Sequence, residues 1–208
     1  MVEFDAKLSQ DLVAILLHDS NLDRTTNGSG NASEHSFSAL AQLDAGQWFG
    51  ADFAGETIPT LSAIARYTLA QQMASNVEIK PTPGLEGLTG TLIARQVALE
   101  WRASPQAPLL SSFAFEALEA AKKEAPDLPR GWLSAELDAD WRQTPTRLGC
   151  VSLHLLHSLL TPTLVQDVHA AGFRLAAWTV NDPARATELL AWGVDTIITD
   201  ALELIRPE

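Results

Sequence analysis

Residues 162–199 read P-T-L-V-Q-D-V-H-A-A-G-F-R-L-A-A-W-T-V-N-D-P-A-R-A-T-E-L-L-A-W-G-V-D-T-I-I-T, and this stretch carries the pattern that decides the fold. It predicts, in order, a helix, a strand, a helix and a strand over Pro162–Ala171, Arg174–Val180, Pro183–Trp192 and Thr196–Thr199. Gly172 and Gly193 follow the two helical patterns, where glycine commonly ends a helix. Strands separated by single helices indicate a parallel sheet covered by helices.

The same alternation extends back toward Met1. The expected strands are Val2–Ala6, Val13–His18, Asn76–Lys80, Pro108–Ser112, Gly131–Ala135 and Cys150–Leu153, and the expected helices are Pro59–Met73, Gly90–Arg102, Phe115–Glu124 and Asp138–Arg142. The loop between the first two strands is too short for a parallel crossover, so these strands should form a hairpin or one continuous strand. Residues 20–57 are rich in Asn, Ser, Gly and Asp and predict an insertion with a short helix over Ser38–Leu43.

Seven of the expected strands can run parallel. A (β/α)₈ TIM barrel has eight strands and about 250 residues, whereas this chain has 208 residues. We therefore expect one domain over residues 1–208, an α/β barrel without its first βα unit. An open doubly wound sheet is the alternative, but the sequence contains no glycine-rich dinucleotide loop to support it.

Composition and charge narrow the classes of function. The formal net charge of -12 argues against nucleic acid as a partner, because no basic stripe is available to displace counterions. No run of about eighteen apolar residues predicts a membrane-spanning helix. The one cysteine, Cys150, has an apolar setting that predicts a buried thiol, which suits a reducing, cytoplasmic location.

Four charged side chains lie on two expected strands in the pattern of a metal site. Glu3 and Asp5 are two residues apart, so they point to the same side of one strand, and Glu78 and Lys80 repeat this spacing. Carboxylates gathered inside a barrel mouth need pairing or a metal ion. Because all the ligands are oxygens, the pattern predicts Mg²⁺ or Ca²⁺. A solvated strand face is the alternative for Glu3 and Asp5 taken alone.

The run from His18 to Gly30, H-D-S-N-L-D-R-T-T-N-G-S-G, follows a strand end and predicts an active-site loop. His18 is the best candidate for proton transfer, because imidazole exchanges protons near neutral pH and Asp19 is its neighbour. Asp23, Arg24 and Asn27 are expected to shape this loop through hydrogen bonds from side chain to backbone.

Two residues of the C-terminal half are further candidates. His154 follows the strand that begins at Cys150 and either faces the site or packs in the interior. Trp178 lies on the strand A-A-W-T-V-N, and the residues alone predict a buried core position for it. The remaining tryptophans are interpreted as packing residues: Trp48, Trp101, Trp132, Trp141 and Trp192.

The chain resembles the glycerophosphodiester phosphodiesterases over nearly its whole length. Besides the His18–Gly30 run, the matching segments are V-E-F-D at 2–5, W-F at 48–49, I-P-T-L at 58–61, V-E-I-K-P at 77–81, S-S-F at 111–113, A-W-T-V-N at 177–181 and G-V-D-T-I-I-T-D at 193–200. The resemblance implies a phospholipase C-like TIM barrel that hydrolyses glycerophosphodiesters to an alcohol and glycerol 3-phosphate.

The resemblance also implies roles for individual residues. Glu3, Asp5 and Glu78 match the family's metal ligands, and Lys80 matches the lysine near the phosphate. Two further matches bear on the substrate. His18 corresponds to the second of two histidines that share the acid and base steps, and Trp178 to the aromatic beside the glycerol group.

One part of the family pattern has no counterpart in this sequence. Family members open with a strand ending in His-Arg-Gly and a helix beginning near Glu-Asn-Thr, whereas the match here begins at Val2. The first histidine and its neighbouring arginine, a bidentate phosphate ligand, are therefore not found. Without that histidine and arginine, we expect little or no activity from this chain alone. A barrel without one strand would also expose sheet edges, so we expect poor solubility or dimerisation across the gap.

Two rival hypotheses remain open. In one, the chain is a catalytically impaired homologue that binds a metal or a phospho-ligand without turnover. In the other, it is a related barrel phosphodiesterase of the phospholipase C or sphingomyelinase D kind. Those relatives match less of the L-D-R-T-T-N-G-S-G segment, and no amphipathic membrane-docking stretch is found in the sequence.

Overall fold

The computed structural model describes residues 1–206, and the chain divides into two compact units. The first unit comprises Met1–Leu110 and Glu116–Leu128. The second comprises Ser111–Phe115 and the chain from Pro129 onward. The interpretation of the chain as one domain stays a prediction.

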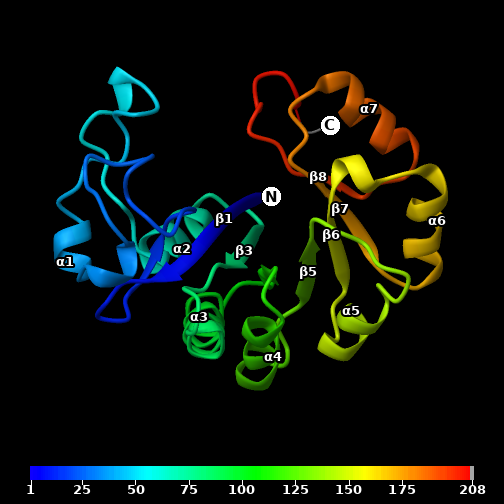
Figure 1. Ribbon diagram of the computed structural model, residues 1–208, viewed down its shortest axis with the longest axis horizontal. Coiled ribbons are helices and arrows are strands. Elements are labelled where there is room, and N and C mark those ends of the chain that lie inside the picture. Colours follow the sequence, from blue (N-terminus) through cyan, green and yellow to red (C-terminus); the bar gives the residue numbers. More distant parts are fainter. Residues whose placement is uncertain (207–208) are drawn as a thin grey trace. The chain divides into compact units, whose positions relative to one another are not determined.

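In the first unit, β1 has a neighbouring strand on each side, and β3 is one of them (Figure 1). They follow the order β2-β1-β3-β4, with bounds β1 Val2–Leu8, β2 Ala14–Leu16, β3 Ser75–Ile79 and β4 Leu109–Ser112, the last of which crosses into the second unit. β1 pairs antiparallel with β2, which confirms the expected hairpin, and parallel with β3. The β1–β3 register places Asp5 opposite Glu78.

Loops, two 3-10 turns and α1 occupy the predicted insertion of this unit, and the longer helices α2, α3 and α4 follow it in the sequence. The helices are the 3-10 turns Ala32–Glu34 and Ala51–Phe53, and α1 Phe37–Leu40, α2 Leu61–Ala70, α3 Glu86–Glu100 and α4 Phe115–Glu124. Leu22 and Leu40 of the insertion pack in one apolar cluster with Ile15 of β2 and with Ile58. Thr60 begins α2, because its side chain accepts a hydrogen bond from the Ala63 N–H.

The second unit continues the β/α alternation. Its elements are β5 Arg130–Ser134, α5 Gln143–Leu148, β6 Ser152–Leu156, the 3-10 turn His157–Leu159, α6 Pro162–Ala170, β7 Arg174–Trp178, α7 Pro183–Ala191 and β8 Thr196–Ile197. Thr161 and Asp182 cap α6 and α7 with side-chain oxygens, and each helix then starts with proline. Gly172 and Gly193 follow the helix ends at φ of 87° and 99°, as their positions in the sequence predict.

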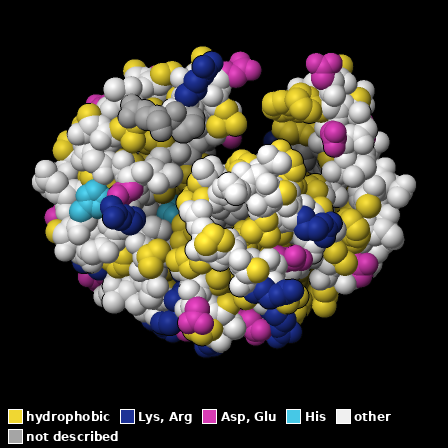
Figure 2. Space-filling view, turned by 180° about the vertical axis from the view of Figure 1, so that it is seen from behind, with side chains coloured by type: hydrophobic (Ala, Val, Ile, Leu, Met, Phe, Trp, Pro, Cys, Tyr) yellow, Lys and Arg dark blue, Asp and Glu magenta, His cyan; other side chains and the backbone are white. Residues whose placement is uncertain are grey.

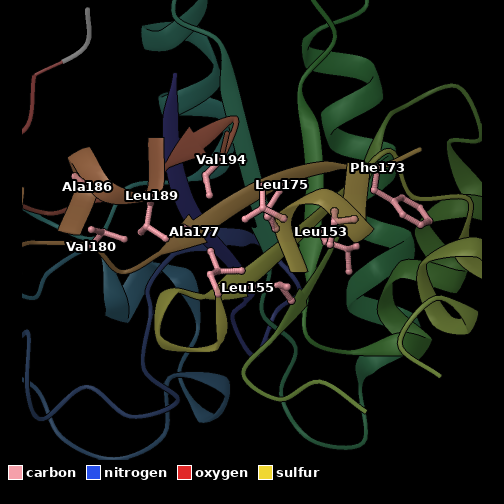
Figure 3. Close-up of a cluster of buried hydrophobic side chains, with 12 residues drawn as sticks. Leu153, Leu155, Phe173, Leu175, Ala177, Val180, Ala186, Leu189 and Val194 are labelled. Carbon is pink, nitrogen blue, oxygen red and sulfur yellow. The ribbon is translucent and has the colours of Figure 1, made fainter. Parts of the chain in front are cut away.

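Helices α6 and α7 cover one face of the strands of this unit (Figure 1). β5, β6, β7 and β8 pair in parallel in that order. Figure 3 shows the core between strands and helices, where alternate residues of β6 and β7 such as Leu155 and Leu175 meet Leu189 of α7. The residues between them on the strands, such as His154, therefore point to the other face.

Several element boundaries differ from the sequence-based expectation, and α3 begins at Glu86, before the predicted start at Gly90. The helix predicted over Asp138–Arg142 is wrong: this segment forms turns, and α5 starts at Gln143 and ends before Gly149 in the left-handed conformation. The last strand ends at Ile197, before Thr199. The Thr199 hydroxyl instead donates to the Asn181 side chain.

Parallel strands that alternate with helices, preceded by one antiparallel hairpin strand, define an α/β fold of the TIM-barrel type. This confirms the predicted fold class. Among the described residues, no helix combines the length and the apolar character needed to span a membrane.

Close helix packing in the first unit gives a prediction on stability. A Cβ atom at Gly90 in α3 would meet the Ala117 backbone of α4, with the carbonyl carbon only 2.8 Å away. Gly90→Ala should therefore lower the free energy of unfolding by about 1–3 kcal/mol, although alanine favours a helix by about 1 kcal/mol. Urea unfolding measures this change.

The matched control is Gly87→Ala in the same helix, because a Cβ at Gly87 meets nothing within 4 Å. That variant should be neutral or slightly more stable. Equal stability of both variants would show that α3 and α4 are not in close backbone contact.

Candidate active site

Three carboxylates converge in the first unit. Glu3 and Asp5 project from the same face of β1, and Glu78 projects from β3 opposite Asp5. One carboxylate oxygen from each residue lies within 4.8 Å of the other two. Glu3 is exposed and Asp5 is half-buried, whereas Glu78 is 8% exposed. The spacing predicted from the sequence thus brings all three together, and the group could hold a metal ion.

Lys80 provides the countercharge that this cluster needs. Its Nζ lies 3.0 Å from Asp5 Oδ1 and 3.3 Å from Glu78 Oε1. Burial and the neighbouring Asp5 charge raise the pKa of the Glu78 carboxyl, while Lys80 and His18 oppose that shift. Without a cation, the like charges of Asp5 and Glu78 would repel each other across the β1–β3 pair.

His18 lies in a chain of three polar side chains at the loop that follows β2. Its Nδ1 is 2.6 Å from Asp19 Oδ1, and Arg24 donates to both oxygens of Asp19, from Nε at 2.6 Å and from Nη2 at 3.0 Å. These hydrogen bonds from Arg24 and His18 hold the pKa of Asp19 well below its usual range. Because an ionised carboxylate only accepts hydrogen bonds, Nδ1 is the donor in this pair, and Nε2 is the ring nitrogen left to exchange a proton.

The loop after His18 partly follows the sequence-based expectation. Asp23 accepts from the Gly30 N–H and Asn27 accepts from the Asp44 N–H, so both side chains bind backbone as predicted. Arg24 does not, because its side chain pairs with Asp19. The interpretation of Trp48 as a packing residue is wrong: it is 52% exposed, and the Arg24 guanidinium lies 5.7 Å from the centre of its ring.

Lys7 was not predicted as a site residue. It is the third residue, after Glu3 and Asp5, on the same face of β1, and it is only 2% exposed. Its Nζ donates to the carbonyl of Asp19 at 2.7 Å and to that of His18 at 3.2 Å. Burial and the nearby Lys80 charge lower the pKa of Lys7 to about 8. The period-2 pattern that singled out Glu3 and Asp5 extends to Lys7 and could have found it.

His154 is buried in the second unit. It is 2% exposed, and its Nε2 lies 3.0 Å from Ser152 Oγ on the same face of β6. Gly131 on β5 leaves room for the imidazole, because a Cβ there would lie 2.6 Å from Nε2. Burial lowers the pKa of His154 to about 4, so the ring is neutral at pH 7.

Trp178 lies at the end of β7 in the same unit. Its indole N–H donates to the His154 carbonyl at 3.0 Å, and its ring meets Phe113 edge-on at 5.3 Å between ring centres. The Trp178 ring is half-buried and Phe113 is 41% exposed, so aromatic surface stays accessible at this strand end.

The structure therefore places the predicted site residues in two groups. The first unit carries Glu3, Asp5, Glu78, Lys80 and His18, and the second carries His154 and Trp178. On the face that Figure 2 shows, basic side chains are scattered among acidic ones and form no continuous basic patch.

Comparison with known proteins places the chain in a family. Residues 1–204 match the model of the glycerophosphoryl diester phosphodiesterase family. The glycerophosphodiester phosphodiesterase of Caldanaerobacter subterraneus subsp. tengcongensis is 34% identical over 98% of this chain and 83% of its own length. The glycerophosphodiester phosphodiesterase of Bacillus subtilis is 27% identical over 99% of this chain and 75% of its own length.

A solved structure agrees with this match. A phosphodiesterase of Oleispira antarctica, in complex with the product sn-glycerol-3-phosphate, is 33% identical and superposes with a TM-score of 0.90 over 96% of this chain and 81% of that one. The chain belongs to the glycerophosphodiester phosphodiesterase family and is a phosphoric diester hydrolase. This confirms the resemblance drawn from the sequence motifs.

Burial of neutral His154 gives a prediction on pH dependence. Its pKa is about 4 in the folded state and about 6.5 in an unfolded chain. Only the unfolded state gains a proton between these values, so the stabilisation is complete above pH 6.5 and declines as the pH falls toward 4. From pH 8 to pH 5, His154 should lower the free energy of unfolding by about 2 kcal/mol.

Urea unfolding of the wild type and of His154→Gln at both pH values measures this term. The His154→Gln variant should lose about 2 kcal/mol less than the wild type over that range. His35→Gln, a change in the insertion, controls for the loss of a histidine as such. The burial argument fails if His154→Gln keeps the full pH dependence of the wild type.

Proposed function

We propose that this phosphodiesterase hydrolyses glycerophosphodiesters to an alcohol and glycerol 3-phosphate with a divalent ion held by Glu3, Asp5 and Glu78. The observation that carries the proposal is the group of three carboxylate oxygens within 4.8 Å of one another. The family membership and the product bound to the Oleispira antarctica phosphodiesterase support the choice of substrate.

The donor set fits a hard divalent ion. All the ligands are carboxylate oxygens, which Mg²⁺ and Ca²⁺ prefer. Ligand distances of about 2.0–2.6 Å allow oxygens on one ion to lie up to about 5 Å apart, and the three oxygens here satisfy that limit. When bound, such an ion polarises phosphoryl oxygens and stabilises their negative charge.

Charge balance explains how an acidic protein could hold an anionic phosphodiester. Glu3, Asp5 and Glu78 bring three formal negative charges, and Lys80 and Lys7 bring two positive ones. A divalent ion would change the local formal charge from one negative to one positive. The site would then attract a phosphodiester despite the net charge of -12 of the whole chain.

His18 and Lys80 supply the groups that act on the substrate. Lys80 would donate to a phosphoryl oxygen, because its ammonium lies beside two of the proposed metal ligands. His18 would exchange one proton at Nε2 with the attacking or leaving oxygen. Asp19 keeps the proton on Nδ1 and would stabilise the imidazolium once Nε2 is protonated, and Arg24 fixes Asp19.

Trp178 is proposed to contact the glycerol part of the substrate. The hydrogen bond from its indole to the His154 carbonyl and its edge contact with Phe113 fix the ring. A direct substrate contact by His154 stays a prediction, and its 2% exposure favours packing.

The only cysteine, Cys150, is buried, which supports a cytoplasmic location. Dimerisation also stays a prediction.

The metal site gives a prediction that does not depend on activity. Glu78→Gln keeps the shape of the side chain but removes one ligand charge from the buried end of the cluster. Affinity for Mn²⁺, measured by calorimetry and by electron paramagnetic resonance, should fall at least about 10-fold. Mg²⁺ and Ca²⁺ should compete with Mn²⁺ for the wild-type site.

Glu203→Gln is the control, because Glu203 is an exposed acid of the second unit. It should bind Mn²⁺ as the wild type does. Wild-type affinity in Glu78→Gln would exclude Glu78 as a ligand.

The reaction itself gives a second prediction. Any turnover of glycerophosphocholine by the chain should require Mg²⁺ or Ca²⁺, should give choline and glycerol 3-phosphate, and should stop when a chelator is added. His18→Ala should lower kcat about 10²–10⁴-fold, the usual contribution of a general acid or base, while Mn²⁺ affinity stays unchanged. An assay of both products measures these effects.

The identity of the products separates the rival functions. Release of phosphocholine and glycerol would indicate a reaction of the phospholipase C type. Metal binding without any hydrolysis would indicate a catalytically impaired homologue. Full kcat in His18→Ala would remove His18 from the mechanism.

A further inference from the structure

In the function proposed above, a buried lysine of the first unit contributes a positive charge and nothing more. Lys7 is 2% exposed, and it lies near the C-terminal end of β1 on the face that carries Glu3 and Asp5. Lysine is almost never fully buried unless it is paired. The contacts of its ammonium group should therefore show why Lys7 is buried.

The two lysines of the site bind different kinds of oxygen. Lys80 lies at 3.0 Å and 3.3 Å from carboxylate oxygens of Asp5 and Glu78. Lys7 instead donates to two peptide carbonyls, at 2.7 Å to Asp19 and at 3.2 Å to His18. Lys80 thus balances the charge of the carboxylates directly, whereas Lys7 ties a segment of backbone to β1.

That segment is the one that carries the proposed acid and base group. β2 ends at Leu16, and the Leu17 N–H still donates to the Asp5 carbonyl at 3.2 Å. The chain then leaves the sheet, and the next two carbonyls are the ones that Lys7 holds. The Asp19 side chain in turn holds His18 Nδ1 at 2.6 Å. A shift of the Asp19 backbone would therefore move both members of the pair.

We propose that Lys7 is a positioning residue that fixes the His18–Asp19 backbone to the strand carrying Glu3 and Asp5, so that the imidazole faces the phosphodiester held there. This inference rests on the proposed function. Lys7 acts through His18 and does not contact the substrate. Misplacement of a catalytic group by about 1 Å can cost about 10²-fold in rate, so one buried anchor at this point has a measurable effect on turnover.

The experiment replaces Lys7 by methionine, which has a similar length but no donor. Lys7→Met should lower kcat on glycerophosphocholine about 10–100-fold with KM changed less than about 3-fold, because only the approach of His18 is disturbed. Lys123→Met, a change at an exposed lysine of α4 paired with Glu119, is the matched control and should keep wild-type kcat.

A double-mutant cycle with His18→Ala tests whether Lys7 acts through His18. In the His18→Ala background, Lys7→Met should cost less than about 2-fold in addition, because the group that it positions is already gone. An equally large loss in both backgrounds would overturn the proposal, since Lys7 would then act on the substrate or on the fold independently of His18.

Hydrogen exchange tests the anchor without any need for activity. In Lys7→Met, amides of the 17–24 segment should exchange at least about 10-fold faster, while amides of β3 keep their protection. Unchanged exchange in this segment overturns the anchor. Absence of turnover in the wild type overturns the proposed function instead, so the two failures are distinguishable.

Lys7→Gln keeps a shorter, neutral donor and replaces Lys7→Met if the latter does not fold. It should give an intermediate kcat and intermediate exchange in the 17–24 segment. Lys7→Gln with kcat as low as that of His18→Ala but with wild-type exchange would overturn the proposal, since a group that only positions the segment cannot act without moving it.

Discussion

The register between β1 and β3 is the constraint on which the proposed chemistry depends. It sets Asp5 opposite Glu78, so two carboxylates face each other from adjacent strands in a partly buried place. Like charges directly opposite are unfavourable in a sheet, and the Lys80 ammonium beside both of them offsets that repulsion. A slip by one residue would turn Glu3 and Asp5 to the other face and scatter the cluster.

The two units use buried polar groups in different ways. At the carboxylate site of the first unit, the buried Lys7 and Glu78 are charged groups, and carboxylates and ammonium groups compensate one another. In the second unit the buried histidine is neutral, because His154 lies against Ser152 with Gly131 on the neighbouring strand.

Residues near one another in sequence were the most predictable. Proline at the start of α6 and α7 and glycine after their ends are local signals, and both helices were predicted within one residue of their bounds. The helix predicted over Asp138–Arg142 was wrong, because the helix of this region starts only at Gln143 and is ended by Gly149 in the left-handed conformation. Arg24 was misjudged for a similar reason, because its partner Asp19 is five residues away across a loop whose path is not local.

The sequence by itself determined the β/α alternation, the common face of Glu3 and Asp5, and the motifs that place the chain among the glycerophosphodiester phosphodiesterases. These depend on periods of 2 and 3.6 residues and on turn chemistry, which neighbouring residues specify. Only the tertiary structure decided that Asp5 lies opposite Glu78 in the β1–β3 register and that Lys7 reaches the His18–Asp19 backbone. Both depend on strand register and on the course of the chain beyond β2, and these are set by contacts between residues far apart in the sequence.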